Sequence, residues 1–236
     1  MSGAAIVTGA AGALGKSIAS RLRRDLGAVL LVDLDEQSLA GVADSIGAHY
    51  VATDLTSEQA PAAVCDALDQ QGWGVQVLVN NAGINRDARA GSMTDENFTT
   101  VLRVDLVAPA RLALSLRGRM GAGASVVNIV SRAAFGNFGQ SNYVAAKSGL
   151  IGLTRALAID WAPDVRVNAI APGLVDTPMT AGMPEKVLTR MVERVPAGRM
   201  GQPEEIAEVV AFLASPAASY VTGQTVVACG GRSIGP

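Results

Sequence analysis

The chain has 236 residues, of which 49% are hydrophobic and 17% are charged, and its mean hydropathy is +0.30. This composition excludes an intrinsically disordered chain and supplies enough apolar surface for one large core in a single domain, 1–236. Lysine and arginine number 19 against 21 acidic residues, and the formal net charge of −2 gives no basic surface for nucleic acid or an anionic membrane.

Cysteine and histidine usage narrows the function classes further. Cys65 and Cys229 have no metal-ligand spacing, and with His49 as the one histidine a metal site is not expected. No apolar run approaches the length of about 18 residues that a membrane span needs, and the N-terminus lacks the basic region of a signal peptide. We therefore expect a cytoplasmic protein.

Short β-branched runs alternate with helical patterns along the whole chain. Strands are predicted at 4–7, 28–32, 49–52, 75–79, 125–130, 165–170 and 225–228. Helices are predicted at 13–25, 36–46, 57–71, 95–117, 141–161 and 203–214. Several strands are apolar on both faces, which is typical of parallel strands covered by helices on both sides. The pattern predicts the α/β class, with a doubly wound sheet of about seven parallel strands.

One segment, 173–202, interrupts this alternation. It is rich in proline, glycine and methionine, and it is too long for an ordinary connection, so we predict a substrate flap at about 174–200. Its methionines suit an adaptable apolar pocket, although ordinary core packing of a flap helix explains them equally well. These methionines are Met179, Met183, Met191 and Met200.

A glycine-rich sequence, 8–15, follows the first predicted strand directly and leads into a helix. Glycines permit a tight turn and a close approach of the backbone to a pyrophosphate at a helix N-terminus. The strand before and the helix after this sequence predict the phosphate loop of a Rossmann-type dinucleotide site. The residues assigned to the cofactor here are Gly9, Ala11, Gly12, Ala13, Leu14 and Gly15.

Asp33 ends the second predicted strand, eighteen residues beyond Gly15. A carboxylate at this distance accepts hydrogen bonds from ribose hydroxyls and repels a 2′-phosphate. Leu34 follows, and then two further acidic residues in place of a lysine or arginine. The alternative for Asp33 is a solvated strand end or a helix cap. The spacing predicts NAD(H), not NADP(H).

The third strand is followed by Asp54 and Leu55, which we place beside the adenine. A cap for the next helix is an equally good interpretation of Asp54. The fourth strand ends in the sequence Asn-Asn-Ala-Gly, 80–83.

Ser131 ends the fifth predicted strand, Tyr143 comes twelve residues later, and Lys147 comes four residues after that. Tyr143 and Lys147 share one helix face, so the ammonium group lies near the phenol. A free tyrosine has a pKa of about 10 and needs a nearby positive charge to act at neutral pH. Taken alone, each residue has an ordinary structural explanation: a tyrosine in the core, a lysine on a solvated face and a serine in a turn. The combined spacing downstream of a nucleotide loop predicts a proton-transfer site in which Ser131 binds a substrate carbonyl.

At these motifs the sequence resembles the short-chain dehydrogenase/reductase family over essentially its whole length. The matching stretches are 8–15, 80–83, Ser131 with the Tyr-Val-Ala-Ala-Lys sequence at 143–147, Pro172-Gly173, and Thr177. Within the family it is most similar to 3-oxoacyl-thioester reductases, through the stretches 81–87, 139–143, 149–153 and 201–206.

The resemblance implies a role for each matching residue. Tyr143 would donate the proton in reduction and accept it in oxidation, Lys147 would lower the pKa of Tyr143 and hold the nicotinamide ribose, and Ser131 would stabilise charge on the carbonyl oxygen. Hydride chemistry would belong to the nicotinamide cofactor. The further cofactor contacts implied are Asn81, Ala82, Gly83, Pro172, Gly173, Val175 and Thr177.

The chain also departs from the family's pattern. Ala13 replaces the middle glycine of the loop, and Cys229 replaces an aspartate after the last strand. Asp105 stands where relatives have a fourth catalytic residue, an asparagine whose backbone carbonyl holds a water in a relay to the lysine. A carboxylate at that position would change the electrostatics around Lys147.

Basic residues that relatives use for carrier-protein docking are missing at 121–124 and 160–164. A coenzyme A thioester therefore becomes at least as good a substrate as an acyl-carrier-protein thioester, with Arg86, Arg89 or Arg132 as candidate phosphate contacts.

Our leading hypothesis is an NADH-linked reductase of 3-oxoacyl thioesters in fatty acid metabolism. The alternative is an NAD-dependent dehydrogenase of another small secondary alcohol, such as a sugar or a steroid. A non-catalytic nucleotide-binding sensor, favoured only by Asp105 and Ala13, comes third. The resemblance and the apolar excess predict a homotetramer or homodimer through 95–117 and 141–161.

Overall fold

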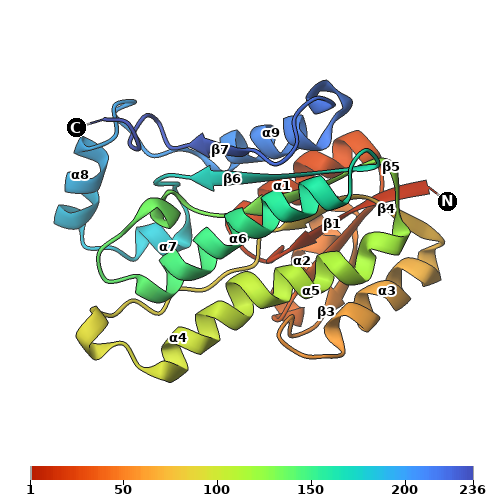
Figure 1. Ribbon diagram of the computed structural model, residues 1–236, viewed down its shortest axis with the longest axis horizontal. Helices are drawn as coiled ribbons and strands as arrows, with labels where there is room; N and C mark the ends of the chain where they lie inside the picture. Colours follow the sequence, from red (N-terminus) through yellow and green to blue (C-terminus); the bar gives the residue numbers. More distant parts are fainter. Residues whose placement is uncertain (1, 236) are drawn as a thin grey trace.

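The computed structural model describes residues 2–235, apart from the side chains of Ser2 and Met179. Its centre is one sheet of seven parallel strands in the order β3-β2-β1-β4-β5-β6-β7 (Figure 1). The strands are β1 (Ser2–Thr8), β2 (Val29–Asp33), β3 (His49–Ala52), β4 (Trp73–Asn80), β5 (Met120–Ile129), β6 (Val165–Pro172) and β7 (Thr225–Ala228). The prediction of a doubly wound parallel sheet is confirmed.

Helices cover both faces of the sheet because successive strand residues point to opposite sides. Val7 and Leu31 pack in one buried cluster with α1 (Ala13–Leu26), α2 (Glu36–Ile46) and α9 (Pro203–Ala214). Their neighbours Ile6 and Leu30 pack in a second cluster with α3 (Ala60–Gln71), α5 (Ala108–Leu116) and α6 (Ser141–Asp160). The two cores fix the carboxyl ends of all seven strands along one edge of the sheet.

The predicted helix 95–117 is wrong as one continuous α-helix. It consists of α4 (Asp95–Leu102), a π-helical turn η2 (Arg103–Val107) and α5. Pro109 has no backbone N–H to donate to the carbonyl of Asp105, so α-helical bonding is interrupted at this point. The backbone N–H of Ala108 instead bonds to the carbonyl of Arg103, five residues earlier. Such π turns are frequent at functional sites.

The helix predicted at 57–71 begins later, at Ala60. The Asp54 carboxylate accepts hydrogen bonds from the backbone N–H and the hydroxyl of Thr56, at 2.9 and 2.8 Å. This turn uses the residues before Ala60. Asp54 therefore closes a local turn and does not cap α3.

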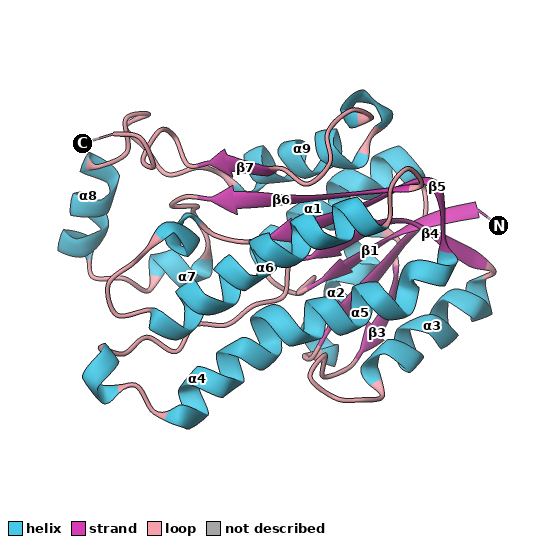
Figure 2. Ribbon diagram, viewed as in Figure 1, coloured by secondary structure: helices cyan, strands magenta, loops and turns pink. Residues whose placement is uncertain are grey.

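The flap segment leaves the carboxyl end of β6 and contains two short helices, α7 (Pro178–Ala181) and α8 (Glu185–Glu193) (Figure 2). Met183, Met191 and Met200 are half-buried, whereas the side chain of Met179 lies outside the described residues. Among the described residues, no helix combines the length and apolar character needed to cross a membrane.

Candidate active site

The glycine-rich loop joins β1 to α1. Gly9 has a φ of +64°, and a Cβ atom there would lie 2.8 Å from the Cα of Ala82. A Cβ atom on Gly15 would lie 2.1 Å from the carbonyl oxygen of Gly9. Both glycines are therefore required by close backbone packing. The turn brings the first N–H groups of α1 to the carboxyl edge of the sheet, where they can bind a pyrophosphate.

The replacement at Ala13 fits this backbone. Ala13 is the first residue of α1, and Gly12, its N-cap, has an ordinary extended φ of −74°. No described non-glycine residue has a positive φ, so Ala13 does not need the conformational freedom of glycine.

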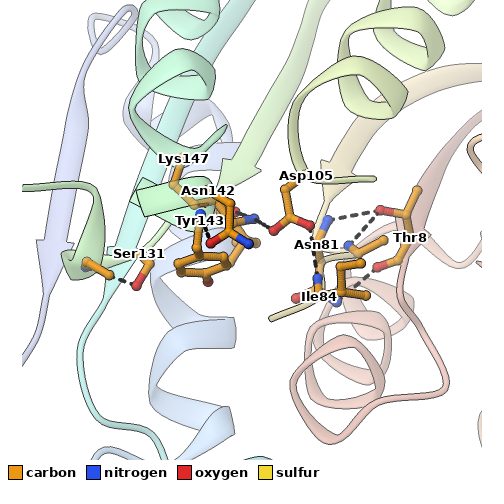
Figure 3. Close-up of polar contacts among 11 residues, drawn as sticks. Thr8, Asn81, Ile84, Asp105, Ser131, Asn142, Tyr143 and Lys147 are labelled. Carbon is orange, nitrogen blue, oxygen red and sulfur yellow. Dashed lines mark hydrogen bonds and ion pairs between the residues drawn. The ribbon is translucent and has the colours of Figure 1, made fainter. Parts of the chain in front are cut away.

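Thr8 and Asn81 fasten the loop to the end of β4 (Figure 3). The Thr8 hydroxyl accepts hydrogen bonds from the backbone N–H groups of Asn81 and Ala82, at 2.9 and 3.1 Å. The Asn81 side-chain amide donates to the carbonyls of Thr8 and Gly9, at 2.9 and 3.1 Å. These hydrogen bonds form the Thr8–Asn81 brace. The brace lies between β1 and β4, where the strand order reverses, and the crevice at such a point is the usual binding site for a dinucleotide.

Asp33 reaches the same loop from the end of β2. Its carboxylate accepts hydrogen bonds from the backbone N–H of Ala11 at 2.9 Å and of Leu34 at 2.7 Å. The acidic group thus lies beside the predicted phosphate loop. Leu55, after β3, packs against the buried cluster that contains Ile6 and Leu30.

Ser131, Tyr143 and Lys147 come together at the carboxyl ends of β5 and β6 (Figure 3). Ser131 caps the short helix η4 (Arg132–Phe135) and accepts a hydrogen bond from the N–H of Ala133 at 3.1 Å. Lys147 is 3% exposed, and its Nζ lies 5.5 Å from the centre of the Tyr143 ring. Tyr143 is half-buried.

Lys147 is held by one hydrogen bond and one ion pair. Its Nζ donates to the carbonyl of Ile129 at 3.1 Å and lies 3.1 Å from Oδ2 of Asp105. Asp105 is fully buried, and its Oδ1 accepts from the N–H of Ile84 at 2.9 Å. Gly83 leaves room for this pair, because a Cβ atom there would lie 2.8 Å from the Asp105 carboxylate.

Burial raises the pKa of the Asp105 carboxyl above its ordinary value of 3.8, and the charge of Lys147 and the N–H of Ile84 oppose this rise in part. The carboxyl group lies directly against the lysine, as an acidic neighbour of the predicted proton-transfer pair. Asp105 lies within the π turn η2.

Asn142 is a site residue that the sequence does not reveal. It is fully buried, and its amide donates to the carbonyls of Arg86 and Asn97, at 2.9 and 3.3 Å. Its oxygen accepts from the N–H of Tyr143 at 2.8 Å. Asn142 therefore fixes the start of α6 against the loop after β4. Its adjacency to Tyr143 is the one sequence signal that points to it.

The remaining predicted cofactor residues follow β6. Gly173 packs directly on the backbone after β7, since a Cβ atom there would lie 2.6 Å from the Cα of Cys229. Val175 is buried, and the N–H of Thr177 donates to the hydroxyl of Thr180 at 2.9 Å. With Pro172 at the end of β6, these residues lie at the same edge of the sheet as Ser131.

This fold, with a glycine loop, an acidic residue at the end of β2 and a half-buried tyrosine beside a buried lysine, is that of a nucleotide-dependent oxidoreductase. The family model described as "Enoyl-(Acyl carrier protein) reductase" matches residues 9–233. The chain belongs to the short-chain dehydrogenase/reductase family. The resemblance found in the sequence is thereby confirmed.

Individual relatives are similar over nearly their full length. The 3-oxoacyl-[acyl-carrier-protein] reductase FabG of Vibrio cholerae is 39% identical over 235 residues, which cover 96% of each chain. The (2S)-[(R)-hydroxy(phenyl)methyl]succinyl-CoA dehydrogenase subunit BbsD of Thauera aromatica is 35% identical and covers 98% of this chain and 96% of its own. A solved structure from Brucella melitensis, titled glucose/ribitol dehydrogenase, superposes with a TM-score of 0.92 at 33% identity and covers 98% and 96% of the two chains.

Proposed function

We propose that this protein is an NADH-linked reductase that converts 3-oxoacyl thioesters to 3-hydroxyacyl thioesters. The observation that carries the proposal is the buried ammonium of Lys147, 5.5 Å from the ring of Tyr143 on the same helix and close to Ser131. The names of two relatives support a thioester substrate, because one is a 3-oxoacyl-carrier-protein reductase and the other a dehydrogenase of a coenzyme A ester.

The proton chemistry belongs to three side chains of this chain. The Tyr143 hydroxyl donates a proton to the carbonyl oxygen of the substrate, and the Ser131 hydroxyl hydrogen-bonds that oxygen as negative charge develops. The Lys147 ammonium favours the negatively charged phenolate that remains. A reduced nicotinamide, when bound, supplies the hydride to the carbonyl carbon.

Two buried side chains position this machinery. Asp105 and the carbonyl of Ile129 hold the Lys147 ammonium from two sides. Asn142 fixes the first turn of α6, which carries Tyr143. Both act through their neighbours and need not touch the substrate.

The residues at the other end fit a dinucleotide. A loop whose two glycines leave no room for a Cβ atom brings backbone N–H groups and the start of α1 to the carboxyl edge. Asp33 would accept hydrogen bonds from the adenosine ribose, and its charge would repel a 2′-phosphate. Asp33 supports NAD(H) as the cofactor.

A small secondary alcohol is the second candidate substrate. The similarity to a structure titled glucose/ribitol dehydrogenase favours it, since the same Tyr–Lys–Ser arrangement can run in the oxidative direction. Assembly as a homotetramer or homodimer is supported by apolar side chains left exposed on α5 and α6, where Leu114 and Ile159 are 57% and 82% exposed. Sedimentation of wild type and of Ile159→Glu tests the assembly, and a wild-type monomer would contradict it.

A substrate panel distinguishes the two functions. Acetoacetyl-CoA and an acetoacetyl-carrier-protein thioester are offered with NADH, and sugars, sterols and simple secondary alcohols are offered with NAD⁺. The proposal expects thioester reduction with a kcat/KM at least about tenfold above that for any alcohol. Oxidation of an alcohol without reduction of either thioester would select the second candidate.

A further inference from the structure

Three arginines line a cavity beside the predicted catalytic serine. The cavity has a volume of about 350 Å³, and its lining includes Arg132, Arg194 and Arg232 together with the exposed ring of Phe138. Arg132 follows Ser131 in the chain, Arg194 follows flap helix α8, and Arg232 lies in the tail after β7. In Figure 1 the end of α8 and the C-terminal tail lie on the same side of the molecule, beyond the carboxyl end of β6.

The guanidinium groups of these arginines have no hydrogen-bond or ion-pair partner among the described residues. None of the three side chains donates a hydrogen bond to another described residue, and no described carboxylate lies within 4.0 Å of them. Other arginines of the chain do pair, as Arg199 does with Glu205 at 2.7 Å. In a chain with a net charge of −2, three unpaired cations around one cavity are a local exception.

The three positive charges repel one another. Partial burial, together with the positive charges of Arg132 and Arg194, lowers the pKa of Arg232 below its ordinary value. An anion in the cavity would relieve this repulsion. A guanidinium fork matches the geometry of a carboxylate or phosphate, with two parallel hydrogen bonds.

We propose that Arg132, Arg194 and Arg232 form a subsite for an oxyanion group of the substrate, either a carboxylate on the acyl chain or a phosphate of the thioester carrier. The cavity volume is at the small end of the range for ligand pockets, which suits a compact anionic group. Bound there, the anion would link the Ser131 segment, the flap and the tail.

The subsite adds a specificity element to the reductase. This step rests on the proposed function, because it assigns the anion to the substrate whose carbonyl Ser131 binds. The capacity to bind an anion does not depend on that function, and the two can be tested apart.

Calorimetric titration of the full-length protein with succinate and with inorganic phosphate tests the subsite without turnover. The proteins compared are wild type, Arg194→Gln, the triple variant R132Q/R194Q/R232Q, and the control Arg190→Gln. Arg190 is exposed one turn before Arg194 on α8 and does not line the cavity. We expect wild type and the control to bind at least one of the two anions equally. The affinity should fall by roughly tenfold in Arg194→Gln, and by more in the triple variant.

Equal affinity in wild type and Arg194→Gln, or no binding of either anion by wild type, would overturn the subsite. Arg194→Gln decides the matter if the triple variant does not fold, because Arg194 is exposed and its substitution should cost little stability. A change in sedimentation of Arg194→Gln would instead identify the cluster as a subunit contact and would also overturn the proposal.

Kinetics then identify the source of the anion. Three thioesters are compared with NADH: acetoacetyl-CoA, which carries phosphates; acetoacetyl-N-acetylcysteamine, which carries no anion; and the N-acetylcysteamine thioester of a 3-oxo dicarboxylic acid, which carries only a carboxylate. The measured quantity is the ratio of kcat/KM for each anionic substrate to that for the neutral one. Arg194→Gln should lower one of these two ratios by about tenfold or more, and Arg190→Gln should leave both ratios unchanged.

A fall of the coenzyme A ratio identifies the carrier phosphate, and a fall of the dicarboxylate ratio identifies the acyl carboxylate. If neither ratio changes, the anion does not belong to the substrate and the proposal fails. If no thioester is reduced but succinate or phosphate binds through the arginines, the proposed function fails and the anion site stands.

Discussion

The two ends of the active-site edge differ in how their polar groups are satisfied. At the nucleotide end, Thr8, Asp33 and Asn81 form hydrogen bonds with one another and with the loop backbone. At the substrate end, helix α8 has no fully buried residue, and the guanidinium groups of Arg194 and Arg232 have no described hydrogen-bond or ion-pair partner.

The difference separates a closely packed loop, which can change little, from a flap whose exposed side chains can vary. A loop in which a single Cβ atom would meet backbone at 2.1 Å tolerates little variation, so it serves one ligand chemistry. A flap with exposed side chains can change its contacts at small cost in stability. The nucleotide end therefore carries the features that the family shares, and we expect the substrate end to determine which substrate is bound.

Tyr143→Phe gives the largest expected effect, because it removes the proton donor and leaves the nucleotide end intact. We expect thioester reduction to fall by roughly a hundredfold to ten-thousandfold. NADH binding, followed by its fluorescence, should stay within about twofold, since Asp33 and the loop are unchanged. The control Tyr50→Phe, on the outer strand β3, should retain full activity. Substantial turnover by Tyr143→Phe would remove Tyr143 from the mechanism.

Gly15→Ala tests the rigidity of the nucleotide end. The added methyl group would meet the carbonyl of Gly9, so the free energy of unfolding should fall by about 1–3 kcal/mol in urea denaturation, with weaker NADH binding. Gly41→Ala is the matched control, because open space surrounds Gly41 on α2. It should raise the stability by about 0.5–1 kcal/mol. Equal effects of the two substitutions would show that the loop is not tightly packed.

Asp33→Asn isolates the charge that we propose selects the cofactor. Asparagine keeps an oxygen for the N–H of Ala11 but does not repel a 2′-phosphate. The ratio of kcat/KM for NADPH to that for NADH should rise by about tenfold. Asp35→Asn, which changes the cap of α2, should leave this ratio unaltered. An unchanged ratio in Asp33→Asn would refute the ribose contact.

Asp105→Asn should have the smallest effect, and a pH-dependent one. Burial raises the pKa of Asp105 in the folded protein above its ordinary value of 3.8. The folded state therefore holds this proton more tightly than the unfolded chain does. The stability that this brings is complete below that value and is lost as the pH rises through the folded pKa.

Asparagine cannot ionise, so the free energy of unfolding of Asp105→Asn, relative to wild type, should increase as the pH is raised from about 4 towards neutrality. Urea denaturation across this range measures the difference, and Asp160→Asn, at the exposed end of α6, is the control. A difference that falls with pH would mean that the ion pair with Lys147 outweighs burial.

Local patterns were sufficient to predict the seven strands and the parallel sheet. They also singled out the glycine-rich loop and the Ser–Tyr–Lys group, whose roles stay predictions. They were insufficient where a single residue redirects the backbone. Pro109 breaks the helix predicted at 95–117, and the turn at Asp54 delays the start of α3. The first residues of β5, Met120 to Gly123, are too glycine-rich and small to show a strand pattern.

Contacts between distant segments were beyond reach of the sequence. The Thr8–Asn81 brace depends on β1 lying beside β4, which the order of elements along the chain does not reveal. The meeting of Arg132, Arg194 and Arg232 depends on the path of the flap. Asp105 was recognised as a departure that would change the electrostatics around Lys147, and the structure adds its direct ion pair with the lysine.

The central proposal is that one chain combines an NADH-selecting aspartate with a 3-oxoacyl reductase site. The most direct test follows the oxidation of NADH and, in parallel, of NADPH by the wild-type protein with acetoacetyl-CoA at neutral pH. We expect NADH to be consumed, with a kcat/KM at least about tenfold above that for NADPH. Faster consumption of NADPH would contradict the role of Asp33, and consumption of neither cofactor would contradict the proposed reaction.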